Sequence, residues 1–202
     1  MSAVLEKDNN KRIAKNTIFL YIRMLLVMAV SLYTSRVVLQ VLGVSDYGVY
    51  NVMGGIIGML GYVNTLLSGA TSRFLTIDLG KGDLNKLKLT FSISNLLCVA
   101  SSIIFLILGE TVGLWFMNTQ LNIDPLRIDA ANWVYQCALL SSVFTVLQSP
   151  FSASIIAHEK MNIYAYMSIF DVIMKLSIVY VLIVFDIDKL KLYSVLLFTV
   201  NI

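Results

Sequence analysis

The sequence predicts an all-α integral membrane protein, built as a polytopic bundle of helices. Of its 202 residues, 58% are hydrophobic and only 13% are charged, and the mean hydropathy is +0.81. These values leave more apolar surface than the core of a soluble protein of this length could bury. Several apolar runs also reach the roughly 20 residues that a helix needs to cross the hydrocarbon of a bilayer.

Five apolar runs are long enough to be complete membrane helices, and a sixth is shorter. The complete runs cover residues 13–41, 49–77, 90–109, 130–156 and 163–185. The sixth covers 192–202, and at about 1.5 Å per residue it is too short to cross about 30 Å of hydrocarbon. We therefore expect six helices, the last incomplete, in an amino-terminal fragment of a longer protein.

The first run carries two arginines, Arg23 and Arg36, thirteen residues apart. At about 100° per residue, a straight helix places them on nearly opposite faces. Each costs roughly 2.5 to 3.5 kcal/mol if it lies at the centre of the bilayer. Two interpretations stay open: both arginines reach opposite interfaces along their aliphatic stems, or they have a functional role.

The first two runs are separated by residues 43–48, which combine two glycines with an aspartate. This composition predicts a tight reversal that makes the two helices antiparallel neighbours. In the second run Gly54, Gly58 and Gly61 recur at intervals of four and three residues and predict a face against which another helix packs closely. The same run ends near Arg73, which places a permanent cation near a membrane face.

The third and fourth runs contain no charged residue, and each contains one cysteine, Cys98 and Cys137. With one histidine in the whole chain, this composition favours no metal site, no cofactor and no disulfide framework. Pro150 predicts a kink in the fourth run, which is either a gate or ordinary packing.

In the fifth run Asp171 and Lys175 lie four residues apart with the acid first, the orientation that best forms a helical ion pair. A pair of this kind within a membrane span either couples transport to an ion gradient or holds the helix against its neighbours. Both interpretations stay open.

The short connections indicate the orientation of the chain. Eight Lys and Arg residues fall on the side of the amino terminus and three on the opposite side, which predicts a cytoplasmic amino terminus. No basic cluster alternates with aromatic residues, so we expect no nucleic-acid partner. The loops are too short for a catalytic domain, so we do not expect an enzyme.

Three stretches of the sequence together resemble a known family. They are residues 36–56 (RVVLQVLGVSDYGVYNVMGGI), residues 70–75 (ATSRFL) with 80–83 (GKGD), and residues 149–161 (SPFSASIIAHEKM). This pattern is similar to the amino-terminal half of bacterial polysaccharide flippases. These O-antigen and oligosaccharide exporters belong to the superfamily that also contains the multidrug and toxic-compound extruders.

The resemblance implies a transporter with two lobes around a central cavity, of which this chain is one six-helix lobe and a carboxy-terminal lobe is missing. The implied function is to move an undecaprenyl-diphosphate-linked oligosaccharide across the bacterial plasma (inner) membrane by alternating access. The implied partners are this lipid-linked oligosaccharide and membrane lipids. Arg23, Arg36 and Arg73 are the positions that match the cationic cavity of the family.

Two alternatives remain. The first is a drug extruder of the same superfamily, which more often places an acid in its first helix, whereas this first run carries arginines. The second is a membrane subunit without transport activity. A membrane enzyme would need a polar catalytic cluster, and His158 beside Glu159 is thin support for one.

Overall fold

The computed structural model describes residues 2–121, 123–185 and 188–201, with side chains from residue 17 onward except at residue 60. Within these ranges the chain forms helices and short connections without any strand, which confirms the all-α prediction. The six α-helices are α1 (Ser2–Lys81), α2 (Leu84–Leu108), α3 (Leu114–Gln120), α4 (Ile128–Ala157), α5 (Met161–Val184) and α6 (Lys189–Asn201). A π-helical turn (Gly109–Gly113) joins α2 to α3, and a 3-10 turn (Pro125–Arg127) precedes α4.

Four helical stretches among the described residues are long and apolar enough to cross a bilayer. They are Thr17–Met59, Leu84–Gln120, Pro125–Ala157 and Met161–Val184. The sequence led us to expect five. The difference arises in α1, where the run predicted over residues 49–77 continues the same helical element as the first span.

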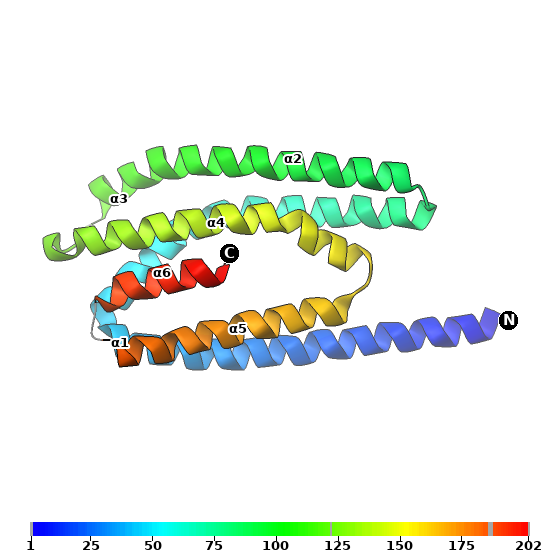
Figure 1. Cartoon of the computed structure of the whole chain (residues 1–202), viewed down its shortest axis with the longest axis horizontal. Coiled ribbons are helices and arrows are strands. Elements are labelled where there is room, and N and C mark those ends of the chain that lie inside the picture. The colour runs from blue at the N-terminus through cyan, green and yellow to red at the C-terminus, as the bar shows by residue number, and fades with distance from the viewer. Residues whose placement is uncertain (1, 122, 186–187, 202) are drawn as a thin grey trace.

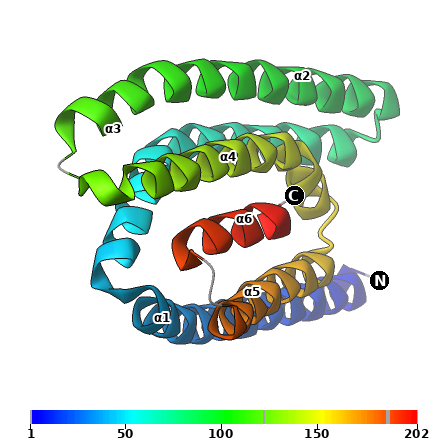
Figure 2. The same cartoon turned by 60° about the vertical axis from the view of Figure 1, so that its left-hand side comes forward.

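The connection between the first two predicted spans differs from the expected reversal. Only Gly43 leaves the helical conformation, with φ 79° and ψ 169°, a positive φ that glycine adopts at little steric cost. Residues 44–48 are already helical again. The chain therefore crosses one end of the bundle before it turns back, as Figure 2 shows.

As a result, the two halves of α1 are not the direct neighbours that we predicted. The first half runs beside α5, whereas the second half runs with α2 and α4 on the opposite side (Figures 1 and 2). The short helix α6 lies between the two sides.

The apolar helical stretch that contains α2 is longer than the predicted 90–109 at both ends, because it runs from Leu84 to Gln120. The carboxylate of Asp83 accepts a hydrogen bond from the backbone N–H of Lys86 (3.1 Å), so Asp83 caps the amino end of α2. This hydrogen bond lowers the pKa of Asp83 below its usual value. At the other end Gly109, the last residue of the predicted run, lies inside the π-helical turn.

Pro150 lies inside α4, which is helical from Ile128 to Ala157. Figure 1 shows α4 bending toward its carboxyl end, as the sequence predicted. The bend carries the end of α4 toward the start of α5.

The helix ends form two groups. The amino terminus, the α1–α2 turn and the α4–α5 turn lie at one end, which we call the N-terminal end (Figure 1). The kink of α1 and the starts of α4 and α6 lie at the other, which we call the kink end. The main apolar core is at the kink end; its largest fully buried members are Val38, Met53, Met117, Tyr135, Leu139, Leu182 and Leu190.

Candidate functional site

A cavity of about 630 Å³ lies between α1, α4, α5 and α6. Its lining includes the later part of α4 and the first part of α5, which lie toward the N-terminal end in Figure 1. We call it the arginine cavity, and its polar lining includes Arg23, Gln148, Ser152, Tyr164, Asp171 and Lys175. One of the three predicted cavity arginines, Arg23, therefore meets the predicted Asp171–Lys175 pair here, although α1 and α5 are far apart in the sequence.

Arg23 is held on the wall of this cavity by an aromatic ring. Its guanidinium carbon lies 4.4 Å from the ring centre of Tyr164, close enough for a cation–π contact. The Nε atom of Arg23 is buried and has no hydrogen-bond partner among the described residues. Because an arginine stays protonated, this wall of the cavity carries a permanent charge with a free donor.

The ion pair predicted within the fifth span is present. The Nζ atom of Lys175 lies 2.9 Å from Oδ2 of Asp171, which confirms the pairing expected from their spacing. Both side chains are partly exposed to the arginine cavity. Their charges offset one another, so Arg23 leaves the described lining with one net positive charge.

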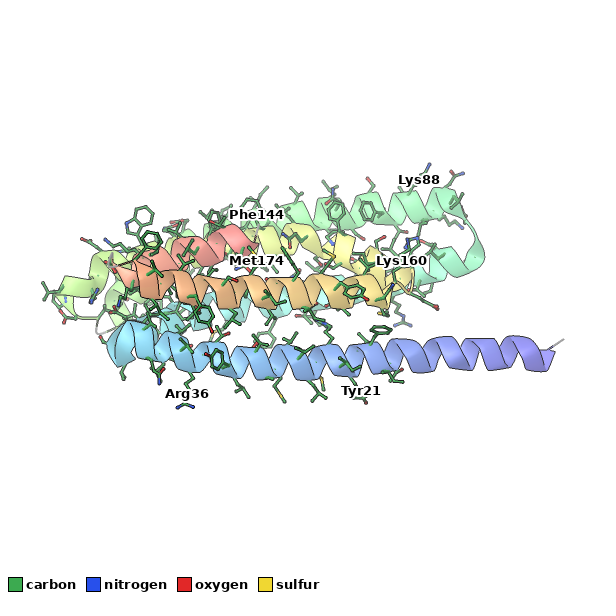
Figure 3. All side chains as sticks on the ribbon, turned by 60° about the horizontal axis from the view of Figure 1, so that its bottom comes forward. Tyr21, Arg36, Lys88, Phe144, Lys160 and Met174 are labelled. Carbon is green, nitrogen blue, oxygen red and sulfur yellow. The ribbon has the colours of Figure 1, made fainter. Side chains whose placement is uncertain are left out.

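The other two arginines do not line this cavity. Arg36 is exposed, and Figure 3 shows it pointing away from the bundle. This agrees with the prediction that Arg23 and Arg36 lie on nearly opposite faces of the first helix. Arg73 is exposed on the second half of α1. The structure therefore brings Arg23, Asp171 and Lys175 together but leaves Arg36 and Arg73 outside.

The glycines of α1 do not make the close helix contact that we predicted. A Cβ atom added at Gly54, Gly58 or Gly61 would meet no other atom within 4 Å. All three instead line a second cavity of about 270 Å³, between α1, α2, α4 and α6. The correction has a simple cause: a face without side chains leaves a hollow when no helix comes close to it.

Close packing occurs instead at the π-helical turn. A Cβ atom added at Gly109 would collide with the side chain of Leu139, and one at Gly113 with the hydroxyl of Tyr135. The hydroxyl of Tyr135 also donates a hydrogen bond to the carbonyl of Gly109 at 2.8 Å. The four-residue spacing of Gly109, at the end of the third apolar run, and Gly113, just beyond it, was a usable signal that the sequence analysis missed.

The kink end also holds an ion-pair cluster that the sequence analysis missed. Arg127 lies with Nε 3.3 Å from Oδ1 of Asp46 and with Nη1 3.8 Å from Oδ1 of Asp188. Asp46 is only 6% exposed, and its Oδ1 has no hydrogen bond of good geometry among the described residues. The cluster therefore joins α1, the start of α4 and the start of α6 by charge.

The remaining chemistry of the described residues is sparse. No group of three or more His, Cys, Asp or Glu side chains in the described ranges could hold a metal ion. Comparisons with family models, with curated proteins and with solved structures find no match to this chain. The arginine cavity is thus the feature on which a function can be argued.

Proposed function

We propose that this chain is part of a membrane transporter that moves undecaprenyl-diphosphate-linked oligosaccharide across the bacterial plasma membrane by alternating access. One observation carries the proposal. Arg23 has a free, buried donor on the wall of a cavity of about 630 Å³, inside a bundle of helices long enough to span a bilayer. Ionisable groups placed in this way mark substrate paths in membrane proteins.

The chemistry of the cavity suits a diphosphate headgroup. A diphosphate is an anion, and the forked donors of arginine form strong charge-assisted hydrogen bonds with phosphate oxygens. The described lining carries one net positive charge, because Lys175 is already paired with Asp171. Arg23 is therefore the residue that we assign to the headgroup.

The arrangement of the two ends supports a direction of loading. In the orientation that the Lys and Arg distribution predicts, the N-terminal end faces the cytoplasm. The arginine cavity lies toward this end, whereas the core and the Arg127 cluster close the kink end. The conformation suits a substrate entering from the inner leaflet. In this proposal a carboxy-terminal lobe completes the cavity and rocks against the present one.

Binding to the purified protein in detergent tests the proposal. A fluorescent undecaprenyl-diphosphate-linked oligosaccharide should bind the wild type, and Arg23→Ala should weaken binding at least tenfold, since a charge-assisted hydrogen bond is worth about 1.5 to 3 kcal/mol. Arg36→Ala is the matched comparison, because it removes the same side chain from the outward face of the same helix.

Three results would contradict the proposal. The first is equal loss of affinity in Arg23→Ala and Arg36→Ala, and the second is no binding of the lipid by the wild type. The third is tighter binding of a lipophilic cation, such as tetraphenylphosphonium, which would favour a drug extruder.

A further inference from the structure

A third cavity, of about 300 Å³, lies between α1, α5 and α6 on the other side of Lys175. Of the nine residues that line it, only Val172 and Leu197 are apolar. The others include the hydroxyl groups of Ser31, Thr34, Ser35, Tyr50 and Tyr193. We call it the hydroxyl cavity. Its size is at the lower end of the range of sites for small ligands.

The serine and threonine hydroxyls of this cavity are free. Elsewhere in the spans Thr145, Ser168 and Ser177 each donate to the carbonyl one turn back in their own helix, at 2.9 Å. No hydrogen bond joins the hydroxyls of the three α1 residues 31, 34 and 35 to another described residue; residues 31 and 35 are exposed and residue 34 is half-buried. An unpaired hydroxyl is unfavourable in hydrocarbon, so this face is suited to a polar occupant.

The hydroxyl cavity offers no unpaired charge. Lys175 is the single charged residue among the nine that line it, and its Nζ lies 2.9 Å from the carboxylate of Asp171. Hydroxyl groups, one amide at Asn201 and no free charge match a neutral, hydroxyl-rich ligand better than an anion. Tyr50 and Tyr193, with ring centres 5.0 Å apart, add aromatic surface for its apolar edges.

The hydroxyl cavity adjoins the arginine cavity. Val172, Lys175 and Asn201 line both, so the two cavities are neighbours on either side of these three residues. We propose that the hydroxyl cavity binds an uncharged sugar ring of the lipid-linked glycan whose diphosphate contacts Arg23. This inference rests on the proposed function and adds a class of sugar to it.

The test compares three lipids on the purified full chain. The probes are undecaprenyl diphosphate alone, the same lipid bearing a neutral hexose trisaccharide, and the same lipid bearing a trisaccharide with a hexuronic acid. The wild type should bind the neutral glycolipid more tightly than the lipid alone. It should prefer the neutral glycan to the acidic one, because the cavity has no free cation.

The variants separate the two cavities. The triple variant with Ser31→Ala, Thr34→Val and Ser35→Ala should bind the neutral glycolipid about tenfold more weakly than the wild type does, since each lost hydrogen bond costs severalfold in affinity. Binding of undecaprenyl diphosphate alone should not change. Thr65→Val is the matched control, because its exposed hydroxyl bonds to its own helix and lines none of these cavities. Thr34→Val alone, which keeps the shape of the side chain, is the second variant if the triple variant does not fold.

The outcomes are distinguishable. The inference fails, while the proposed function stands, if the variants keep the full gain in affinity that the neutral glycan gives over the lipid alone. It also fails if the wild type binds the acidic glycolipid more tightly than the neutral one. If the wild type binds none of the three lipids, the proposed function fails and the inference fails with it. A loss of affinity for undecaprenyl diphosphate alone in the hydroxyl variants, equal to that for the neutral glycolipid, would also overturn the inference.

Discussion

The two ends of the bundle are built differently. At the kink end, α1, α3, α4, α5 and α6 share one apolar core, and Arg127 holds the buried Asp46 by charge. Toward the N-terminal end the buried clusters are small, and the space between the helices is taken up by the arginine cavity. The comparison teaches that one end of the bundle is packed to hold its shape, whereas the other is left hollow, with charged side chains on the cavity wall.

The difference follows from what holds helices together in a bilayer. Apolar side chains gain little by leaving lipid, so helix contacts depend on close packing and on paired polar groups. The kink end has both, in the Gly113–Tyr135 contact and the Asp46–Arg127 pair. At the N-terminal end Arg23 keeps a buried donor without a partner, which stabilises nothing until a ligand binds.

The largest expected effect comes from removing the cation of the kink end. Arg127→Met leaves the carboxylate of Asp46 buried without its charge partner, which we expect to destabilise the protein by about 2 to 3 kcal/mol. Thermal unfolding in detergent measures this loss. Asp46→Asn in the same chain should restore most of it, because no buried charge remains. An unchanged melting temperature in Arg127→Met would show that the cluster does not hold the kink end.

The next effect separates the two sets of glycines. Gly113→Ala forces a methyl group against the hydroxyl of Tyr135, so we expect a loss of about 1 to 2 kcal/mol. Gly58→Ala is the control, because its Cβ meets nothing within 4 Å and alanine is the better helix former. Melting curves of the two variants test this contrast. Equal destabilisation by both substitutions would show that Gly58 of α1 is also closely packed against another helix.

A smaller effect on stability is expected at the cavity. Asp171→Asn leaves Lys175 unpaired, but both side chains are partly exposed, so the change in stability should stay below about 1 kcal/mol. Its main effect should be tighter binding of undecaprenyl diphosphate, since the lining gains a positive charge. Titration of the lipid onto this variant and onto Lys175→Met measures the change. A melting temperature lowered as far as in Arg127→Met would favour a structural role for the pair.

The smallest effect concerns the N-terminal end of α2. The pKa of Asp83 is lowered by its hydrogen bond to the amide of Lys86, so its stabilising effect is present at neutral pH and is lost as the pH falls through the folded pKa. The protection of the first amides of α2 against hydrogen exchange, taken relative to the intrinsic exchange rate at each pH, should therefore fall in acid. Asp83→Asn keeps a capping side chain without the charge and should abolish this pH dependence. The same acid response in that variant would assign it to another group.

The sequence was sufficient where the cause is local. Runs of apolar residues gave the helices, the spacing of Asp171 and Lys175 gave their ion pair, and the thirteen-residue separation put Arg23 and Arg36 on different faces. Each of these depends only on the geometry of a single helix. The same reasoning placed Arg23 correctly on a face but could not say which face meets a cavity.

The sequence was insufficient where the cause is the arrangement of several helices. A glycine face looks the same whether a helix packs on it or a cavity opens beside it, and this is why the role of Gly54, Gly58 and Gly61 was wrong. Arg127 and Asp46 are distant in the sequence and meet only because the chain continues as a helix past Gly43. That single-residue kink and a multi-residue turn have the same glycine-rich composition.

Accessibility of the arginine cavity is the most direct test of the account. Ser152→Cys, in a chain with Cys98→Ala and Cys137→Ala, places one thiol on the cavity wall. We predict that a membrane-impermeant thiol reagent labels it from the cytoplasmic side, that undecaprenyl diphosphate slows the labelling, and that Arg23→Ala abolishes this protection. Labelling only from the opposite side, or an equal rate with and without the lipid, would contradict the account.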